Sequence, residues 1–126
     1  LIDESYNANP ASMAATLEQL GREPATRRIA VLGAMRELGA ESDAFHRALA
    51  PQLLAAKVDF AYLVGEEMQP LAFALVGQME FAHGNDVEAV LQQLKGEIRP
   101  GDAILIKGSN SVGLSRIVAA LTGGGN

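Results

Sequence analysis

Five short apolar runs alternate along the chain with five segments of helical spacing, and this alternation narrows the possible folds more than any other feature. The runs cover residues 1–2, 29–32, 60–64, 79–82 and 103–106. Short, β-branched runs bounded by glycine or proline are typical of strands buried on both faces. The alternation predicts an α/β fold, in which a doubly wound, mostly parallel, Rossmann-like sheet of five or six strands is flanked by helices.

The segments between the runs each place apolar residues on one face of a helix. These residues are Met13, Leu17 and Leu20; Phe45, Ala48, Leu49, Leu53 and Ala56; Met68, Leu71, Ala72 and Leu75; Val87, Val90, Leu91 and Leu94; and Leu114, Ile117, Val118 and Leu121. Asn9 and Pro10 read as an N-cap followed by proline at the first helical position. Asn85 with Glu88 resembles a capping box. His46 is expected at the boundary between the buried and exposed sides of its helix.

Length and composition favour one domain, over residues 1–121, followed by a flexible glycine-rich tail over residues 122–126. The chain has no cysteine, so it has no disulfide and no cysteine-based metal site, as is usual in the cytoplasm. Its net charge of -5 disfavours a nucleic-acid binder. No apolar run approaches the roughly 18 residues of a membrane span. The first run lacks a starting methionine, which favours a piece of a longer protein.

Ligands of open α/β sheets bind beyond the carboxyl ends of the strands. That rule selects five loops here, over residues 3–9, 33–39, 65–67, 83–86 and 107–111. The loop over residues 33–39 carries Arg36 and Glu37 between two glycines, and a tight turn with a surface ion pair is the favoured interpretation.

The first of these loops is the richest in polar groups. Asp3, Glu4, Tyr6, Asn7 and Asn9 bring carboxylates, a hydroxyl and amides together before a helix N-terminus. Carboxylates at a strand end bind ribose hydroxyls or a metal, and amides orient a nucleotide, so these five residues are candidate cofactor-binding residues. The alternatives are that Asn9 only caps the helix and that Tyr6 only covers the sheet edge.

The last loop is the second candidate. Lys107 leaves a buried strand and is followed by Gly108 and Ser109 at a helix start, an arrangement that suits a phosphate or carboxylate. The order of residues is not that of a Walker A loop. A solvated lysine beside an ordinary helix cap explains the same residues equally well, and the sequence leaves both interpretations open.

Several kinds of site are disfavoured. His83 and Asp86 lack a third partner for a metal site, no specific Ser-His-Asp set can be assembled, and the dinucleotide fingerprint is absent after the first run. A free-standing flavodoxin-like or receiver-like interaction module stays open as an alternative, since Asp3, Glu4 and Lys107 superficially match a receiver. Against it, the third run ends at Gly65, where a receiver has its phospho-acceptor aspartate.

Three segments in order, over residues 1–13, 28–39 and 100–109, resemble the C-terminal domain of the Mur ligase family. Within that family they are most similar to the ligases that join D-alanyl-D-alanine to UDP-N-acetylmuramoyl-tripeptide in peptidoglycan synthesis. The resemblance departs from the usual pattern at Glu4, where aspartate is common, at Ala34, where aspartate is also common, and at Asn110, which often has an arginine counterpart.

The resemblance implies a cytoplasmic, ATP-dependent ligase that proceeds through an acyl phosphate. It implies that the N-terminal domain holds the UDP-sugar, that the central domain mainly holds ATP and Mg²⁺, and that this domain closes over them. No catalytic residue and no metal ligand is expected here, and the isolated domain should be inactive. Asp3, Glu4, Tyr6, Asn7 and Asn9 match positions near ATP, whereas Lys107, Gly108 and Ser109 match positions on the dipeptide side of the cleft. Neither nucleic acid nor a membrane is expected as a partner.

Overall fold

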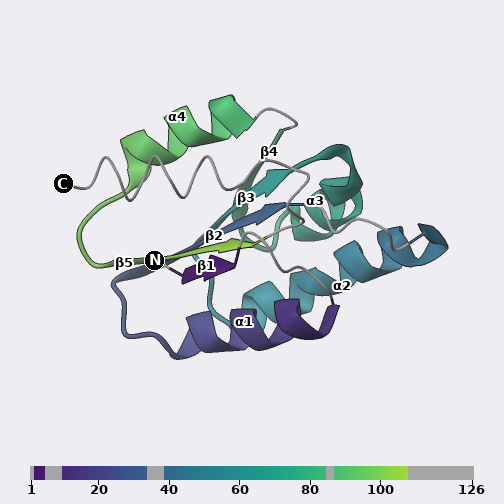
Figure 1. Ribbon diagram of the computed structural model, residues 1–126, viewed down its shortest axis with the longest axis horizontal. Helices are drawn as coiled ribbons and strands as arrows, with labels where there is room; N and C mark the ends of the chain where they lie inside the picture. Colours follow the sequence, from purple (N-terminus) through teal and green to yellow (C-terminus); the bar gives the residue numbers. More distant parts are fainter. Residues whose placement is uncertain (1, 5–9, 34–38, 85–86, 108–126) are drawn as a thin grey trace.

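The described part of the chain is built around one five-stranded parallel sheet. A computed structural model describes residues 2–4, 10–33, 39–84 and 87–107. The strands lie in the order β1-β5-β2-β3-β4, and every neighbouring pair is parallel (Figure 1). Their bounds are β1 Ile2–Glu4, β2 Arg27–Gly33, β3 Phe60–Val64, β4 Glu80–Gly84 and β5 Asp102–Lys107. The prediction of a parallel α/β sheet is confirmed.

Helices cover both faces of this sheet, as a doubly wound fold requires (Figure 1). They are α1 Pro10–Arg22, α2 Ser42–Ala55, α3 Gln69–Leu75 and α4 Val87–Glu97, with 3₁₀ turns η1 Gly39–Glu41 and η2 Glu66–Met68. Helices α1, α2 and α3 pack on one face over Leu32, Leu63 and Leu105. Helix α4 packs on the other face over Val31 and Ile106. Neighbouring strand residues alternate between these two clusters because side chains of a strand point to opposite faces in turn.

Four strands differ in extent from the apolar runs that predicted them. β1 continues through Asp3 and Glu4, which were expected in a loop, and β4 continues through His83 and Gly84. β2 begins at Arg27, two residues before its apolar run, and β5 extends one residue beyond its run at each end. In each case hydrogen bonding to a neighbouring strand continues beyond the apolar run, because the backbone pairs regardless of side-chain polarity.

The interpretation of His46 as a boundary residue is wrong, because its side chain is fully buried on the inner face of α2. The helix expected over residues 114–121, and the caps at Asn9 and Asn85, lie outside the described residues. The division at residue 121 stays a prediction for the same reason. Among the described residues, no helix is both long enough and apolar enough to cross a bilayer.

Candidate functional site

Strand order brings the two richest candidate segments to one edge of the sheet. β5 lies between β1 and β2, so that Lys107 at its carboxyl end is in register with Glu4 on one side and Leu32 on the other. Asp3 is in register with Ile106. Residues about a hundred positions apart in the sequence therefore lie on adjacent strands, as the rule for open α/β sheets anticipated.

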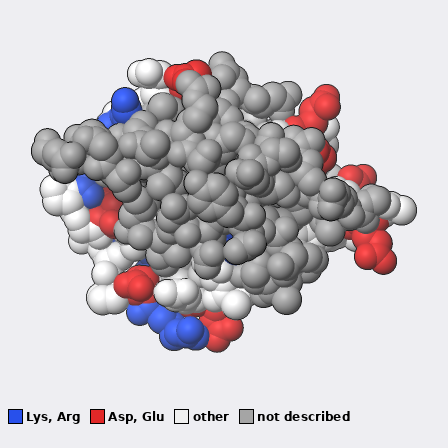
Figure 2. All heavy atoms as spheres, in the orientation of Figure 1, with Lys and Arg blue, Asp and Glu red and all other residues white. Residues whose placement is uncertain are grey.

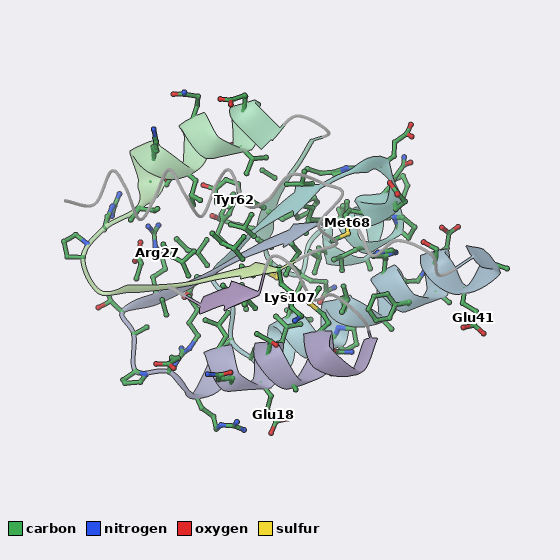
Figure 3. The ribbon with its side chains drawn as sticks, in the orientation of Figure 1. Glu18, Arg27, Glu41, Tyr62, Met68 and Lys107 are labelled. Carbon is green, nitrogen blue, oxygen red and sulfur yellow. The ribbon has the colours of Figure 1, made fainter. Side chains whose placement is uncertain are left out.

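Lys107 is the best-defined member of this edge. Its side chain is fully buried, with 0% of its surface exposed. Because Lys107 is two residues beyond Leu105 along β5, it belongs to the face that α1 covers, and α1 contacts β5 (Figure 3). The interpretation of Lys107 as a solvated lysine is therefore wrong. A buried ammonium group needs anionic or polar groups around it to offset the loss of hydration. Lys107 therefore places a buried basic group at the carboxyl end of β5.

The remaining predicted site residues divide into two sets. For Asp3 and Glu4 the structure gives the backbone, which places both in β1 at the edge just described. Tyr6, Asn7, Asn9, Gly108 and Ser109 lie outside the described residues, so their roles stay predictions. In the sequence, residues 5–9 follow β1 and residues 108–109 follow β5.

At the far side of the same edge, His83 has a structural role. Its Nε2 donates a hydrogen bond of 2.8 Å to the carbonyl oxygen of Gly65, and the Gly65 amide donates to the carbonyl of Gly84 at 3.0 Å. These bonds join the loop after β3 to the end of β4. Within the described residues, no three His, Cys, Asp or Glu side chains gather closely enough to hold a metal ion.

His46 also lies toward this edge, in the first turns of α2, but it faces the core. Its Nδ1 donates a hydrogen bond of 2.8 Å to the carbonyl oxygen of Ser42, and its ring meets Phe45 edge-on at 5.3 Å. Burial lowers the pKa of His46, an effect that outweighs the opposing hydrogen bond and the nearby carboxylates of Glu67 and Asp43. A neutral, hydrogen-bonded histidine of this kind stabilises the helix start. Polar identity alone gave no sign of this burial.

The charged pair with the best geometry lies at the opposite edge of the sheet. Arg27 and Asp102 begin β2 and β5, and the guanidinium donates to the carboxylate through Nε at 3.2 Å and Nη2 at 2.8 Å. The hydrogen bond from Arg27 holds the pKa of Asp102 below its usual range. Figure 3 shows Arg27 and Lys107 at opposite ends of the sheet, so this pair does not contribute to the carboxyl edge. Elsewhere on the described surface visible in Figure 2, acidic and basic side chains are scattered around the margin, without a broad basic patch.

Comparison with known proteins agrees with this geometry. Residues 1–110 match the family model described as "Mur ligase, glutamate ligase domain". Over 96% of its length the chain is 38% identical to the UDP-N-acetylmuramoyl-tripeptide--D-alanyl-D-alanine ligases of Synechocystis and of Escherichia coli K12. It spans only 27% and 26% of the length of those two relatives.

Solved structures show the same relation. The chain superposes on MurF from Acinetobacter baumannii with a TM-score of 0.78 and 28% identity, covering 94% of this chain and 26% of that one. It superposes on MurF ligase from Thermotoga maritima in complex with ADP with a TM-score of 0.75 and 28% identity, covering 90% of this chain and 26% of that one. The family match extends over most of the chain and over all five strands of the sheet. The chain therefore belongs to the Mur ligase family and corresponds to its glutamate ligase domain.

Proposed function

We propose that the chain is the C-terminal domain of a ligase that joins D-alanyl-D-alanine to UDP-N-acetylmuramoyl-tripeptide in peptidoglycan synthesis. The observation that carries the proposal is the carboxyl edge, where Glu4 and the buried Lys107 lie in register on β1 and β5. The relatives that match 96% of this chain are named for that activity, and they include proteins from organisms as different as Synechocystis and Escherichia coli.

For the whole protein the proposed reaction has two steps. A carboxylate oxygen of the tripeptide attacks the γ-phosphorus of ATP, which forms an acyl phosphate and releases ADP. The amine of D-alanyl-D-alanine then attacks the acyl carbon, and the tetrahedral intermediate expels phosphate to leave an amide. Water would hydrolyse the acyl phosphate, so a domain that closes over the reactants both aligns the amine and excludes water.

The carboxyl edge is the part of this domain that would face those reactants. Asp3, Glu4, Tyr6, Asn7 and Asn9 would contact the nucleotide. The related MurF ligase from Thermotoga maritima was solved in complex with ADP, which supports nucleotide binding by a protein that contains this fold.

Lys107, Gly108 and Ser109 would form the dipeptide side of the cleft. A basic group at the end of β5 suits an anion such as the dipeptide carboxylate or a phosphate. Mg²⁺, which would neutralise the phosphate oxygens, would be held mainly by the central domain rather than by the residues described here.

The competing proposal is a free-standing flavodoxin-like or receiver-like interaction module without enzyme activity. β3 ends at Val64 and is followed by Gly65, so the phosphorylatable aspartate of such a module has no counterpart there. The match to about a quarter of each relative favours instead a domain that works with N-terminal and central domains of the same ligase. Nucleic acids and membranes are not among the partners we propose.

The test is release of ADP by the full-length protein that contains this chain. We expect sustained release over many turnovers to require both UDP-N-acetylmuramoyl-tripeptide and D-alanyl-D-alanine, and to stop when residues 1–126 are deleted. The 126-residue chain alone should release none. Sustained release without D-alanyl-D-alanine, beyond one ADP per enzyme, or release that survives the deletion, would contradict the proposal; D-alanine supplied in place of the dipeptide is the matched control for amine specificity.

A further inference from the structure

A groove of about 530 Å³ lies between α1 and α2, away from the carboxyl edge. It is lined by the second half of α1 and by the end of α2, and both of these segments lead into the amino ends of the next strands. The volume falls within the roughly 300–1,000 Å³ of small-molecule sites. The groove is separate from the carboxyl edge, so a ligand bound there would be independent of the proposed function.

The floor of the groove is apolar and fixed. Leu17 and Ala56 line it and also belong to the buried core. Gly21 of α1 packs so closely on α2 that a Cβ atom added there would lie 3.0 Å from the Cα atom of Ala56. The two helices therefore cannot approach further and close the groove, and the small side chains of Ala14 and Ala55 leave it open above the floor.

Lys57, at one rim of the groove, has an unusual backbone. Its amide donates to the carbonyl of Leu54 at 3.1 Å, and the amide of Val58 donates to the carbonyl of Leu53 at 3.2 Å. This is the Schellman arrangement that ends a helix, and its left-handed position is usually glycine. Here that position is Lys57, with φ of 58°. Glycine would adopt this conformation with less strain, so the presence of a lysine at position 57 indicates that its side chain has a function.

The charges around the groove leave one basic group available to a ligand. Glu18 and Arg22 line the opposite wall and bind each other at 2.8 Å, and Figure 3 shows Glu18 on the outer side of α1. Within the described residues, Lys57 takes part in no ion pair. Gln52 adds an amide to the wall, and its Oε1 is buried without a hydrogen-bond partner among the described residues. The groove thus combines an apolar floor with a cation at its rim and an amide on its wall.

We propose that this groove binds a small amphipathic anion, with its apolar body on Leu17 and Ala56 and its carboxylate at Lys57. An aromatic or short aliphatic carboxylic acid has this chemistry.

The test uses 4-phenylbutyrate as the probe and follows the backbone amide resonances of the 126-residue chain by NMR. A domain with this fold has been crystallised separately: the chain superposes with a TM-score of 0.59 and 16% identity on a domain from Haemophilus ducreyi, covering 87% of that chain. We expect saturable shifts confined to the groove, at Leu17, Gly21 and Ala55, with a Kd on the order of 1 mM for a ligand of this size.

Three variants at one position separate the ligand from the fold. Lys57→Met and Lys57→Gly should both weaken binding by about three- to ten-fold, as expected for a partly exposed charged contact, whereas Lys57→Arg should keep it. Lys57→Gly should melt at a higher temperature than Lys57→Met, because only glycine relieves the left-handed backbone. Ala55→Leu should fill the groove and abolish binding while the chain stays folded.

Three results would overturn the proposal. The first is the absence of chemical-shift changes at the groove residues with 20 mM probe. The second is equal affinity of Lys57→Met and the wild type for the probe. The third is equal binding by 4-phenylbutanol, which has the same apolar body without the charge. The alcohol should bind more weakly than the acid in the wild type, and the two should bind alike in Lys57→Met.

Discussion

Substituting Asp102 by asparagine should destabilise the protein measurably, although Asp102 lies far from the candidate site. The carboxylate accepts hydrogen bonds from Arg27 at 2.8 and 3.2 Å and from the backbone amide of Arg99 at 2.9 Å. Arg27 also donates to the carbonyl of Glu97 at the end of α4. Asp102 thereby joins β2 to β5 and to the turn after α4, which lie about 75 residues further along the sequence.

The magnitude follows from the exposure of the two partners. The side chain of Asp102 is 3% exposed and that of Arg27 is 26% exposed. Hydrogen bonds to a charged group contribute roughly 1.5–3 kcal/mol when buried, whereas exposed ion pairs contribute about 0.2–1 kcal/mol. Because asparagine keeps one acceptor and solvent reaches the pair from one side, we expect Asp102→Asn to cost about 1.5 kcal/mol. For a domain of this size, that corresponds to a Tm lower by roughly 4–8 °C.

The pH dependence gives a second, independent readout. The hydrogen bond from Arg27 lowers the pKa of Asp102 in the folded state below its ordinary value. The stability that Asp102 contributes is therefore complete above its unfolded pKa of about 3.9 and is lost as the pH falls through the lower folded value. The difference between wild type and Asp102→Asn should be constant from pH 7 to pH 5 and should shrink below about pH 4.

The assay is urea unfolding of both proteins at pH 7, 5 and 3, followed by circular dichroism. Glu18→Gln is the matched control, because the Glu18–Arg22 pair has the same 2.8 Å contact but side chains that are 72% and 68% exposed. We expect no measurable loss of stability from that change. An Asp102→Asn protein as stable as the wild type at pH 7, or a difference that grows toward pH 3, would refute the reasoning.

Two further predictions concern glycine and histidine. Gly101→Ala should destabilise the protein more than Gly77→Ala, because both glycines have positive φ (93° and 77°) but only a Cβ at Gly101 would meet Thr26 Oγ1, at 2.8 Å; equal urea midpoints for the two variants would contradict this. Burial lowers the pKa of His46, so the unfolded state binds protons more readily and the wild type should lose stability as the pH falls from about 7 through the ordinary histidine pKa near 6.5. His46→Gln should be less stable at pH 7 yet lose less between pH 7 and 5, and parallel stability profiles would show that His46 does not titrate as its burial implies.

The sequence predicted the fold well because the information is local. Each buried strand is an apolar run because helices cover both faces of the sheet. The runs Ile29 to Leu32 and Phe60 to Val64 can therefore be recognised as strands without knowing which strands lie beside them. The ends of the strands were harder to predict. Glu4 and His83 continue their strands because their backbones pair with β5 and β3. Their polar side chains do not indicate this pairing in the sequence.

The candidate site was only partly predictable because its chemistry depends on strand order. The burial of Lys107 follows from the position of β5 between β1 and β2 beneath α1, and nothing near Lys107 in the sequence indicates which strands flank it. The ion pair of Arg27 with Asp102 joins residues 75 positions apart and has the same origin. The amphipathic pattern of α2 identified its buried face but did not show that His46 belongs to it.

The most direct test of the proposed site is the response of the full-length ligase to Glu4→Ala and Asn7→Ala. Glu4 ends β1, and Asn7 follows it by three residues in the sequence. Because neither residue belongs to an apolar run, we expect each substitution to cost no more than about 0.5 kcal/mol of stability. Loss of one hydrogen bond to a charged group in the closed complex should lower kcat/KM for ATP about ten- to a hundred-fold. We predict that loss with an unchanged Tm, while Glu18→Gln keeps full activity. Near-normal kcat/KM in both variants, or activity lost only in proportion to a falling Tm, would contradict a nucleotide-contacting role for the carboxyl edge.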